Sequence, residues 1–413
     1  MIVGLDIGTS KVVAIVGEVD PSGQIEIVGI GSHPSKGMKK GVVVNIESTV
    51  QSIQRAVEEA ELMAGCQIHS VYVGIAGSHV RSLNSHGIVA IRDQEVAPAD
   101  VEQVLDAAKA VAIPADQKVL HILPQEYVID NQEGIREPLG MSGVRLEAKV
   151  HLVTCAVNAA QNIEKCIRRC GLEVEEVILE QLASSHAVLT DDERELGVCI
   201  VDIGGGTTDI AIFQDGIIRH TAVIPFGGNV ISDDIRQGCQ IMKKQAEQLK
   251  KKFGSALSQE TKPNEIVCIP GLTGRKPKEI ALKTLAQIIE ARMTEIIEHV
   301  HYEIRSSGFG DQLIGGIVLT GGGSQLKHVT QLFQFVTGLD CRLGFPAEHI
   351  ASAPEDTSIP SYSTGVGLVI KGYDHKWNTS DNESSTSNAK PVIDFGSNFM
   401  KSIKNWFETD DAT

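Results

Sequence analysis

The stretch Gly197–Phe213, GVCIVDIGGGTTDIAIF, decides the fold that this sequence predicts. Its apolar residues predict a buried strand over 198–201 and a second strand over 210–213, with Asp202 and a glycine-rich turn between them. Glycines adopt positive φ angles readily and let backbone N–H groups converge on an anion, because no Cβ atom stands in the way. The turn is therefore a candidate phosphate-binding loop. Asp202 beside it is a candidate partner, through water, of the Mg²⁺ that accompanies a nucleotide.

The beginning of the chain repeats this arrangement. Residues 2–17, IVGLDIGTSKVVAIVG, again place an aspartate, Asp6, and a glycine turn between two apolar runs. One such turn alone is more often an ordinary hairpin, but two copies that share the aspartate favour two similar halves facing one ligand. A third glycine run, 321–324, follows an apolar strand at 316–320 and would let a nucleotide base or ribose lie against the backbone.

The motifs DIGTSK (6–11), DIGGGTTD (202–209) and LTGGGSQL (319–326) resemble, in order and spacing, the phosphate-1, phosphate-2 and adenosine motifs of the actin, Hsp70 and sugar-kinase superfamily. The resemblance implies an α/β, two-lobed actin-like ATPase fold with ATP and Mg²⁺ between the lobes. It implies nucleotide contacts from Asp6, Gly8, Thr9, Ser10, Lys11, Gly204, Gly205, Gly206, Thr207, Thr208, Gly321, Gly322, Gly323 and Ser324, with Asp6 and Asp202 around Mg²⁺.

The same resemblance implies roles for three further residues. Glu180 stands where the superfamily carries a polar residue that orients the water attacking the γ-phosphate, although Gln181 replaces the proline that often follows. Glu247 and Lys250 match an E-x-x-K pair that faces adenosine in Hsp70-like proteins. Charged residues on a solvated helix face are the alternative for each of them. Any ATPase activity is expected to be slow.

The composition limits the classes of protein to consider. The 413 residues are 42% hydrophobic with 40 glycines, which is typical of a large α/β protein of two or more lobes. A net charge of −16 argues against nucleic acid as a partner. The eight cysteines lack zinc-ligand spacing and are expected to be free thiols in a reducing cytoplasm. We expect no signal peptide, because a strand begins at the N-terminus, and no transmembrane helix, because no run of about 18 apolar residues exists.

Residues 84–162 predict a small α+β domain inserted into the first lobe. The expected order is a strand at 87–91, a helix from 98 to about 112, and strands at 119–124 and 147–156. The segments ILPQEYVID (122–130) and EPLGMSG (137–143) resemble the extra domain, 1C, of the FtsA family of bacterial cell-division proteins. A decorated loop is the alternative, which the length and the apolar pattern of the insertion disfavour.

The C-terminal tail predicts a membrane anchor on a tether. Residues 371–394 include WNTSDNESSTSNAK (377–390), which has almost no apolar content and predicts a disordered linker. Apolar residues then recur at helical spacing, with lysines between them: Phe395, Phe399, Met400, Ile403, Trp406 and Phe407, with Lys401 and Lys404. This pattern predicts an amphipathic helix at 395–408 in the headgroup region of an anionic membrane, with docking on the protein itself as the alternative. Proteins of the FtsA family also end in a linker and such a helix.

The resemblance to the FtsA family implies a domain map and a function. The map assigns 1–83 and 163–196 to the first lobe (1A), 84–162 to 1C, 197–225 and 307–370 to the second lobe (2A), and 226–306 to subdomain 2B. The implied function is ATP binding and attachment of the FtsZ ring to the cytoplasmic face of the cell membrane at the division site. The implied partners are the FtsZ C-terminal peptide, near Arg292 and Glu295 in 2B, other copies of the chain, and later division proteins that bind 1C.

Other classes of protein share the nucleotide motifs. A pilus-assembly actin relative would bind a membrane protein's cytoplasmic peptide and should lack the terminal helix. An Hsp70-like ATPase would need a β-rich peptide-binding domain after the ATPase unit. A sugar kinase would need a catalytic aspartate in a substrate cleft, and the sequence singles out no candidate.

Overall fold

The computed structural model describes residues 1–20, 24–262, 264–271, 276–346, 350, 352, 354 and 357–384, with side chains up to residue 376. The predicted amphipathic helix at 395–408 and the last part of the predicted linker lie outside the described residues. Within the described part of the chain, no helix combines the length and the apolar character needed to cross a bilayer.

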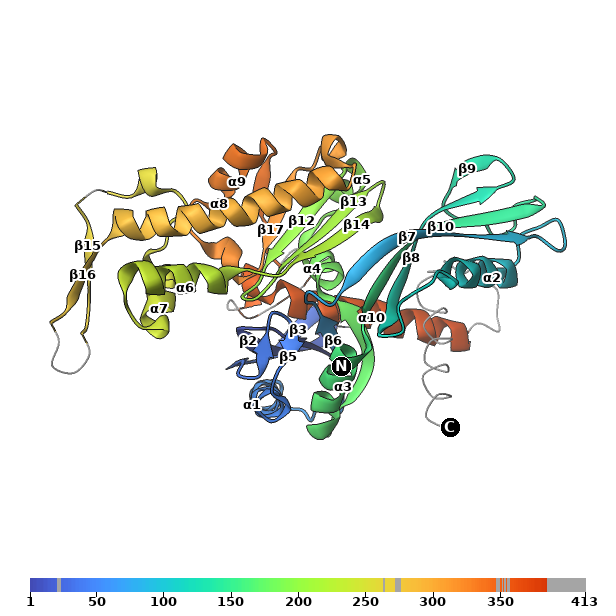
Figure 1. Cartoon of the computed structure of the whole chain (residues 1–413). Helices are drawn as coiled ribbons and strands as arrows, with labels where there is room; N and C mark the ends of the chain where they lie inside the picture. The colour runs from blue at the N-terminus through green and yellow to red at the C-terminus, as the bar shows by residue number, and fades with distance from the viewer. Residues whose placement is uncertain are drawn as a thin grey trace.

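Two five-stranded sheets with the same connectivity form the cores of two lobes (Figure 1). In each sheet, three consecutive strands pair antiparallel and two later strands add parallel to the first of them. The first sheet has the order β11-β6-β1-β2-β3: β1 Ile2–Ile7, β2 Lys11–Val19, β3 Ile25–Pro34, β6 Ser70–Ile75 and β11 Glu173–Leu179. The second has the order β14-β13-β12-β17-β18: β12 Val198–Ile203, β13 Thr208–Gln214, β14 Ile217–Ile224, β17 Ile317–Thr320 and β18 Cys341–Leu343. Asp6 and Asp202 each occupy the fifth position of the corresponding strands, β1 and β12, so the repeat in the sequence is a repeat in the structure.

Helices cover the outer faces of both sheets. Lobe 1 carries α1 Ile46–Ala64 and α3 Val157–Arg169, with the small hairpin β4 Met38–Lys39 and β5 Val42–Val43 beside them. Lobe 2 carries α5 Asp191–Leu196, α6 Gly228–Cys239, α7 Lys243–Phe253, α8 Leu282–Ser306 and α9 Val329–Thr337, with the hairpin β15 Ile266–Ile269 and β16 Lys278–Ala281 at its far end. The apolar stripe of α8 is buried in the core of lobe 2, and each such side chain contributes about 1.5–3 kcal/mol.

Two helices, α4 (Glu180–Val188) and α10 (Ser363–Ser384), connect the lobes and touch where they cross. A Cβ atom on Gly367 of α10 would lie 1.9 Å from the carbonyl oxygen of Ala183 in α4, so only glycine permits this approach. The sequence predicted a disordered linker from residue 371, and this boundary is too early because α10 continues. Gly372 packs on Tyr72, and the Tyr72 hydroxyl lies 3.2 Å from Nδ1 of His375. Packing on lobe 1 therefore orders a segment whose composition is largely polar.

The inserted segment forms a separate domain beside both lobes (Figure 1). A four-stranded sheet has the order β7-β10-β8-β9, and α2 packs on it: β7 Arg81–Ala90, α2 Pro98–Lys109, β8 Gln117–Ile129, β9 Gln132–Ile135 and β10 Arg145–Ala156. The sequence missed the second half of β8 and all of β9, where the chain reverses at Asp130 with a φ of 57°. The domain ends at Ala156 rather than at 162, because α3 packs in the core of lobe 1.

Candidate functional site

The two predicted phosphate loops face each other from opposite lobes. A Cβ atom on Gly205 would lie 2.0 Å from Oγ of Ser10, and one on Gly206 would lie 2.6 Å from Oγ1 of Thr9. The second loop is a tight turn in which the Gly204 amide donates to the Thr207 carbonyl at 3.0 Å. Bare glycine backbone therefore permits the close approach of the two loops. The junction between the lobes where they meet is the candidate nucleotide cleft.

Four carboxyl groups gather at this cleft: Asp6, Asp202, Asp209 and Glu180. Burial, with the neighbouring carboxylates adding to it, raises the pKa of Asp6 to about 7 and that of Asp209 to about 8. Burial also raises the pKa of Asp202, and it raises that of Glu180 well above its ordinary value. The buried Oδ1 atoms of Asp6 and Asp209 have no hydrogen-bond partner among the described residues.

This group of carboxyl groups would suit a hydrated Mg²⁺ ion that is already bound to nucleotide phosphates. The described residues contain no group of three or more His, Cys, Asp or Glu side chains that could hold a metal ion. Mg²⁺ usually keeps several waters and binds one or two carboxylates together with phosphate oxygens. Such a cation would lower the raised pKa values of Asp6 and Asp209. Its water ligands would give the unpartnered oxygens of these two residues a hydrogen-bond donor.

Asp202 is fixed in place by both connecting helices. The Ser184 hydroxyl of α4 donates to Oδ2 of Asp202 at 2.8 Å, and the Thr364 hydroxyl of α10 lies 3.3 Å from the same oxygen. The two hydroxyls also lie 2.9 Å from each other. Both bonds oppose the effect of burial on the pKa of Asp202. Sequence reasoning missed this pair, since Ser184 and Thr364 are adjacent only in the folded chain.

Lys11 supplies a positive charge to the same cleft. Its Nζ atom lies 3.4 Å from the centroid of the Tyr362 ring, a distance at which a cation is attracted to the ring. Burial lowers the pKa of the Lys11 ammonium to about 8, although Asp6 opposes the effect. A phosphate group in the cleft would stabilise the charged form.

The third glycine run packs against the end of β12. Gly321 has a φ of +81°, and a Cβ atom there would lie 2.2 Å from Oδ1 of Asp202. Gly323 packs as closely on Ile203, and the Ser324 hydroxyl donates to the Gly321 carbonyl at 2.8 Å within the turn. Only Gly322 has free space, with its nearest neighbour at 3.9 Å. The turn is therefore held beside Asp202 and can present bare backbone to a ligand at one position.

Glu247 and Lys250 are linked to the second predicted phosphate loop by a chain of hydrogen bonds. Their side chains form an ion pair at 2.8 Å, and the Lys250 ammonium also donates to the Gly228 carbonyl at 2.8 Å. The Gly228 amide in turn donates to the carbonyl of Gly204 in the loop at 2.9 Å. The resemblance implied adenosine contacts for this pair and did not reveal these bonds, which link residues far apart in the sequence.

Arg292 and Glu295, the predicted partner-binding residues, belong to an ion-pair network between two helices of lobe 2. The Arg292 guanidinium donates to both carboxylate oxygens of Asp234 in α6, at 2.5 and 3.1 Å, and to Glu295 in α8.

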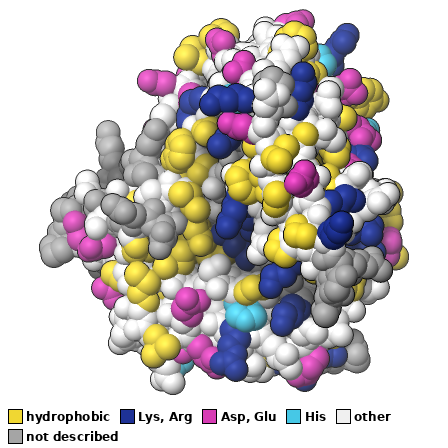
Figure 2. Space-filling view, turned by 90° about the vertical axis from the view of Figure 1, so that its left-hand side faces the viewer, with side chains coloured by type: hydrophobic (Ala, Val, Ile, Leu, Met, Phe, Trp, Pro, Cys, Tyr) yellow, Lys and Arg dark blue, Asp and Glu magenta, His cyan; other side chains and the backbone are white. Residues whose placement is uncertain are grey.

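Figure 2 looks onto the end of the molecule that carries α7, where Lys and Arg side chains are frequent. The exposed lysines of α7 there are Lys243, Lys244, Lys251 and Lys252.

Comparisons with known proteins agree on one family. The model described as "SHS2 domain inserted in FTSA" matches residues 77–154, and the model described as "Cell division protein FtsA" matches residues 199–367. The chain is 61% identical over 372 residues to the cell division protein FtsA of Pseudomonas aeruginosa, covering 90% of this chain and 89% of the relative. It is 47% identical over 379 residues to that of Escherichia coli K12, covering 90% of each.

Solved structures of low sequence identity share the fold. The PilM-PilN type IV pilus biogenesis complex contains a chain with a TM-score of 0.67 and 16% identity, covering 90% of this chain and 98% of the other. MreB 5 of Spiroplasma citri bound to AMPPNP has a TM-score of 0.57 and 17% identity, covering 92% of this chain and 98% of the other. These neighbours confirm the predicted two-lobed actin-like fold.

Proposed function

The chain belongs to the FtsA family of cell division proteins, and we propose that it binds ATP with Mg²⁺ between its lobes and anchors the FtsZ ring to the cytoplasmic face of the cell membrane. The observation that carries the nucleotide part is the pair of facing loops, since each lobe brings one glycine turn and one aspartate to the same cleft. Backbone N–H groups and carboxylates in this arrangement suit the phosphates and the hydrated cation of a nucleotide.

Each residue of the cleft has a part in this proposal. The loops at 8–11 and 204–208 bind phosphate oxygens, and Lys11 neutralises part of their charge. Asp6 and Asp202 would hold Mg²⁺ through its water shell. The charge of the cation would balance the negative charge of the ionised carboxyl groups. The turn at 321–324 contacts adenosine, and Glu180 orients a water molecule for slow hydrolysis.

Membrane attachment rests on the tail, residues 395–408. Six large apolar residues at helical spacing with two lysines between them suit the headgroup region of an anionic bilayer. One such helix binds weakly, but copies of the chain assembled side by side would bind firmly through avidity. The tail therefore makes the protein peripheral to the cytoplasmic membrane.

Three kinds of protein partner follow from the family. We infer that the FtsZ C-terminal peptide binds 2B near Arg292 and Glu295, that the chain assembles with copies of itself, and that later division proteins bind the inserted domain. A pilus-assembly role and an Hsp70-like role, which the sequence left open, gain no support, because the relatives of 47–61% identity are cell division proteins.

Co-sedimentation with anionic liposomes tests the anchoring role. The full chain, with MgATP, should pellet with liposomes and carry FtsZ with it, whereas a chain truncated after Ile393 should leave both proteins in the supernatant. Two single substitutions separate insertion from charge. Ile403→Glu, on the apolar side of the helix, should abolish pelleting, whereas Asn405→Glu, on the polar side, should weaken it only slightly. Equal pelleting of the full and truncated chains would overturn the anchoring role.

A further inference from the structure

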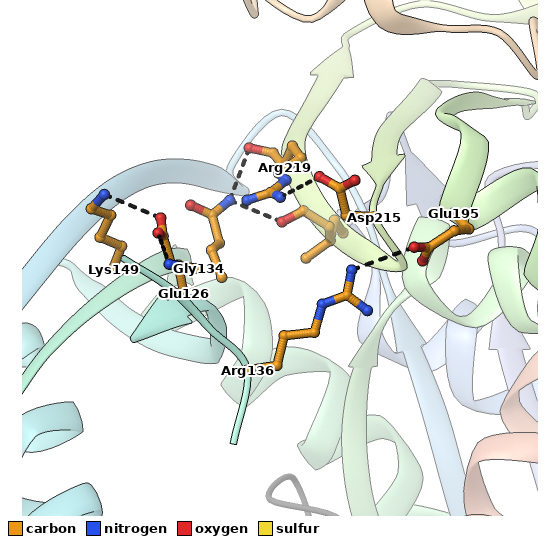
Figure 3. Close-up of polar contacts among 9 residues, drawn as sticks. Glu126, Gly134, Arg136, Lys149, Glu195, Asp215 and Arg219 are labelled. Atoms are coloured by element: carbon orange, nitrogen blue, oxygen red, sulfur yellow. Dashed lines mark hydrogen bonds and ion pairs between the residues drawn. The ribbon is translucent and has the colours of Figure 1, made fainter. Parts of the chain in front are cut away.

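The inserted domain is bonded to the exposed edge of the lobe 2 sheet (Figure 3). The Gln125 side chain of β8 donates from Nε2 to the carbonyls of Ile218 at 2.9 Å and Arg219 at 3.2 Å, both in the edge strand β14. The Ser82 hydroxyl of β7 donates to the carbonyl of Thr221 in the same strand at 2.8 Å. These bonds satisfy edge carbonyls that would otherwise face water.

A buried histidine adds a fourth contact. Nε2 of His151 lies 2.9 Å from the Thr221 hydroxyl, and Nδ1 lies 2.7 Å from Oδ1 of Asn84. Because an amide oxygen only accepts, Nδ1 carries the proton and Nε2 accepts from Thr221. Burial lowers the pKa of His151 to about 4, so the ring stays neutral at neutral pH. Farther out, Arg136 lies 3.5 Å from Glu195 of α5, an exposed pair that adds little free energy (Figure 3).

The same domain is joined to lobe 1 by much stronger means. Strand β10 runs straight into α3 with no loop between them. The Leu179 amide, at the end of β11, donates to Nε2 of His121 in β8 at 3.0 Å. The inserted domain therefore spans the two lobes: it is covalently continuous with one, and a few polar side chains hold it on the other.

The strand that it holds leads directly to the nucleotide cleft. Strand β14 pairs with β13, and Val223 lies opposite Asp209 while Thr221 lies opposite Ala211. Because the two strands are paired, a movement of β14 also moves Asp209 in the cleft. The carbonyl groups of β14 that accept hydrogen bonds from Gln125 move with it.

The interface also has room for movement. A cavity of about 300 Å³ lies beside the contacts of the inserted domain with β14, lined on lobe 2 by His220, Thr221 and Glu303. Gln181, the neighbour of Glu180 in α4, lines the same cavity, is fully buried, and has no hydrogen-bond partner for either amide atom among the described residues. Such an unsatisfied group at a loosely packed interface lowers the cost of leaving this arrangement.

We propose that docking of the inserted domain on β14 is energetically coupled to nucleotide binding in the cleft. This inference rests on the proposed nucleotide function and adds a mode of regulation to it. In this structure the inserted domain is docked on β14, and the phosphate loops of the two lobes touch. A nucleotide that contacts both loops favours this arrangement of the lobes and therefore favours docking. Coupling is reciprocal, so a partner that pulls the inserted domain off β14 weakens nucleotide binding by the same factor.

The substitution Gln125→Ala tests the coupling, with Gln132→Ala as the matched control. Both glutamines belong to the sheet of the inserted domain, but Gln132 is an exposed residue of β9. Two quantities are measured on the full chain: the affinity for MgATP, and deuterium uptake by the backbone amides of residues 217–224. Gln125→Ala should raise uptake in β14 without nucleotide and weaken MgATP binding by about three- to tenfold, the range expected for loss of one or two net hydrogen bonds. Gln132→Ala should match the wild type in both measurements.

The two measurements separate failure of the coupling from failure of the nucleotide site. If Gln125→Ala raises deuterium uptake in β14 but binds MgATP as the wild type does, Gln125 holds the domain on β14 but docking is not coupled to nucleotide binding. The inference is then overturned. If uptake does not change, Gln125 does not hold the domain and the inference also fails. If the wild type itself does not bind MgATP, the proposed nucleotide function fails and the coupling fails with it.

Discussion

Replacing Ser184 with alanine should weaken the binding of MgATP far more than the binding of ATP without Mg²⁺. The substitution removes the hydrogen bond that Asp202 accepts at 2.8 Å and leaves only the Thr364 hydroxyl, at 3.3 Å, on the same oxygen. A hydrogen bond to a charged group contributes about 1.5–3 kcal/mol. The nucleotide-free protein loses the same bond, so only the part that depends on an ionised Asp202 affects binding. With about half of this free energy, roughly 0.8–1.5 kcal/mol, lost on binding, the affinity for MgATP should fall by about four- to twelvefold.

Ser185→Ala is the matched control for this experiment. Ser185 is buried in the same helix, but its hydroxyl donates to the Leu182 carbonyl at 2.7 Å and does not touch Asp202. Calorimetric titration with ATP at pH 8, in Mg²⁺ and in EDTA, gives the four affinities that are needed. The reasoning is wrong if Ser184→Ala binds MgATP as tightly as Ser185→Ala does, or if the loss is the same in EDTA.

Three further predictions follow from the geometry and the charges. Gly321→Ala should lower the free energy of unfolding in urea by about 1–3 kcal/mol more than Gly338→Ala, since both positions have positive φ but only Gly321 would also clash with Asp202; equal losses would contradict the clash. The folded nucleotide-free protein keeps protons on Asp6, up to a pKa of about 7, and on Asp209, up to about 8, whereas the unfolded chain releases them near 3.8. The free energy of unfolding should therefore fall as the pH rises from about 4 to about 8, and Asp209→Asn should reduce the slope in thermal melts; an unchanged slope would refute the assignment. Arg292→Ala should weaken FtsZ-peptide binding in fluorescence anisotropy while changing stability by about 1 kcal/mol or less, because its ion pairs are partly exposed; unaltered peptide affinity would exclude Arg292 from the peptide site.

The sequence predicted those parts of the fold that are written in local patterns. The strand, aspartate and glycine turn recur at Asp6 and Asp202, and both copies take the same place in two equivalent sheets. The long helix α8, Leu282–Ser306, is of the same local kind, because its buried apolar residues recur at continuous helical spacing. Segments without a periodic pattern were less predictable. The polar residues that follow Lys371 fold as part of α10 because Tyr72, far away in the sequence, offers a packing surface.

The functional details that the sequence did not reveal all depend on tertiary contacts. Ser184 and Thr364 meet at Asp202 only because α4 and α10 cross there. The engagement of Arg292 by Asp234 depends on the packing of α8 against α6. No spacing rule links residues so far apart, so the motifs predict groups that would contact a nucleotide but not the groups that hold them in place.

Hydrogen exchange with and without MgATP tests most directly whether one nucleotide is held by both lobes. Deuterium uptake is measured in the loops at 6–11 and 203–208 and in the turn at 321–324. The geometry predicts that MgATP protects all three segments together and that Asp202→Asn removes the protection from all three. Protection of one loop alone, or of none, would contradict a nucleotide site shared between the lobes.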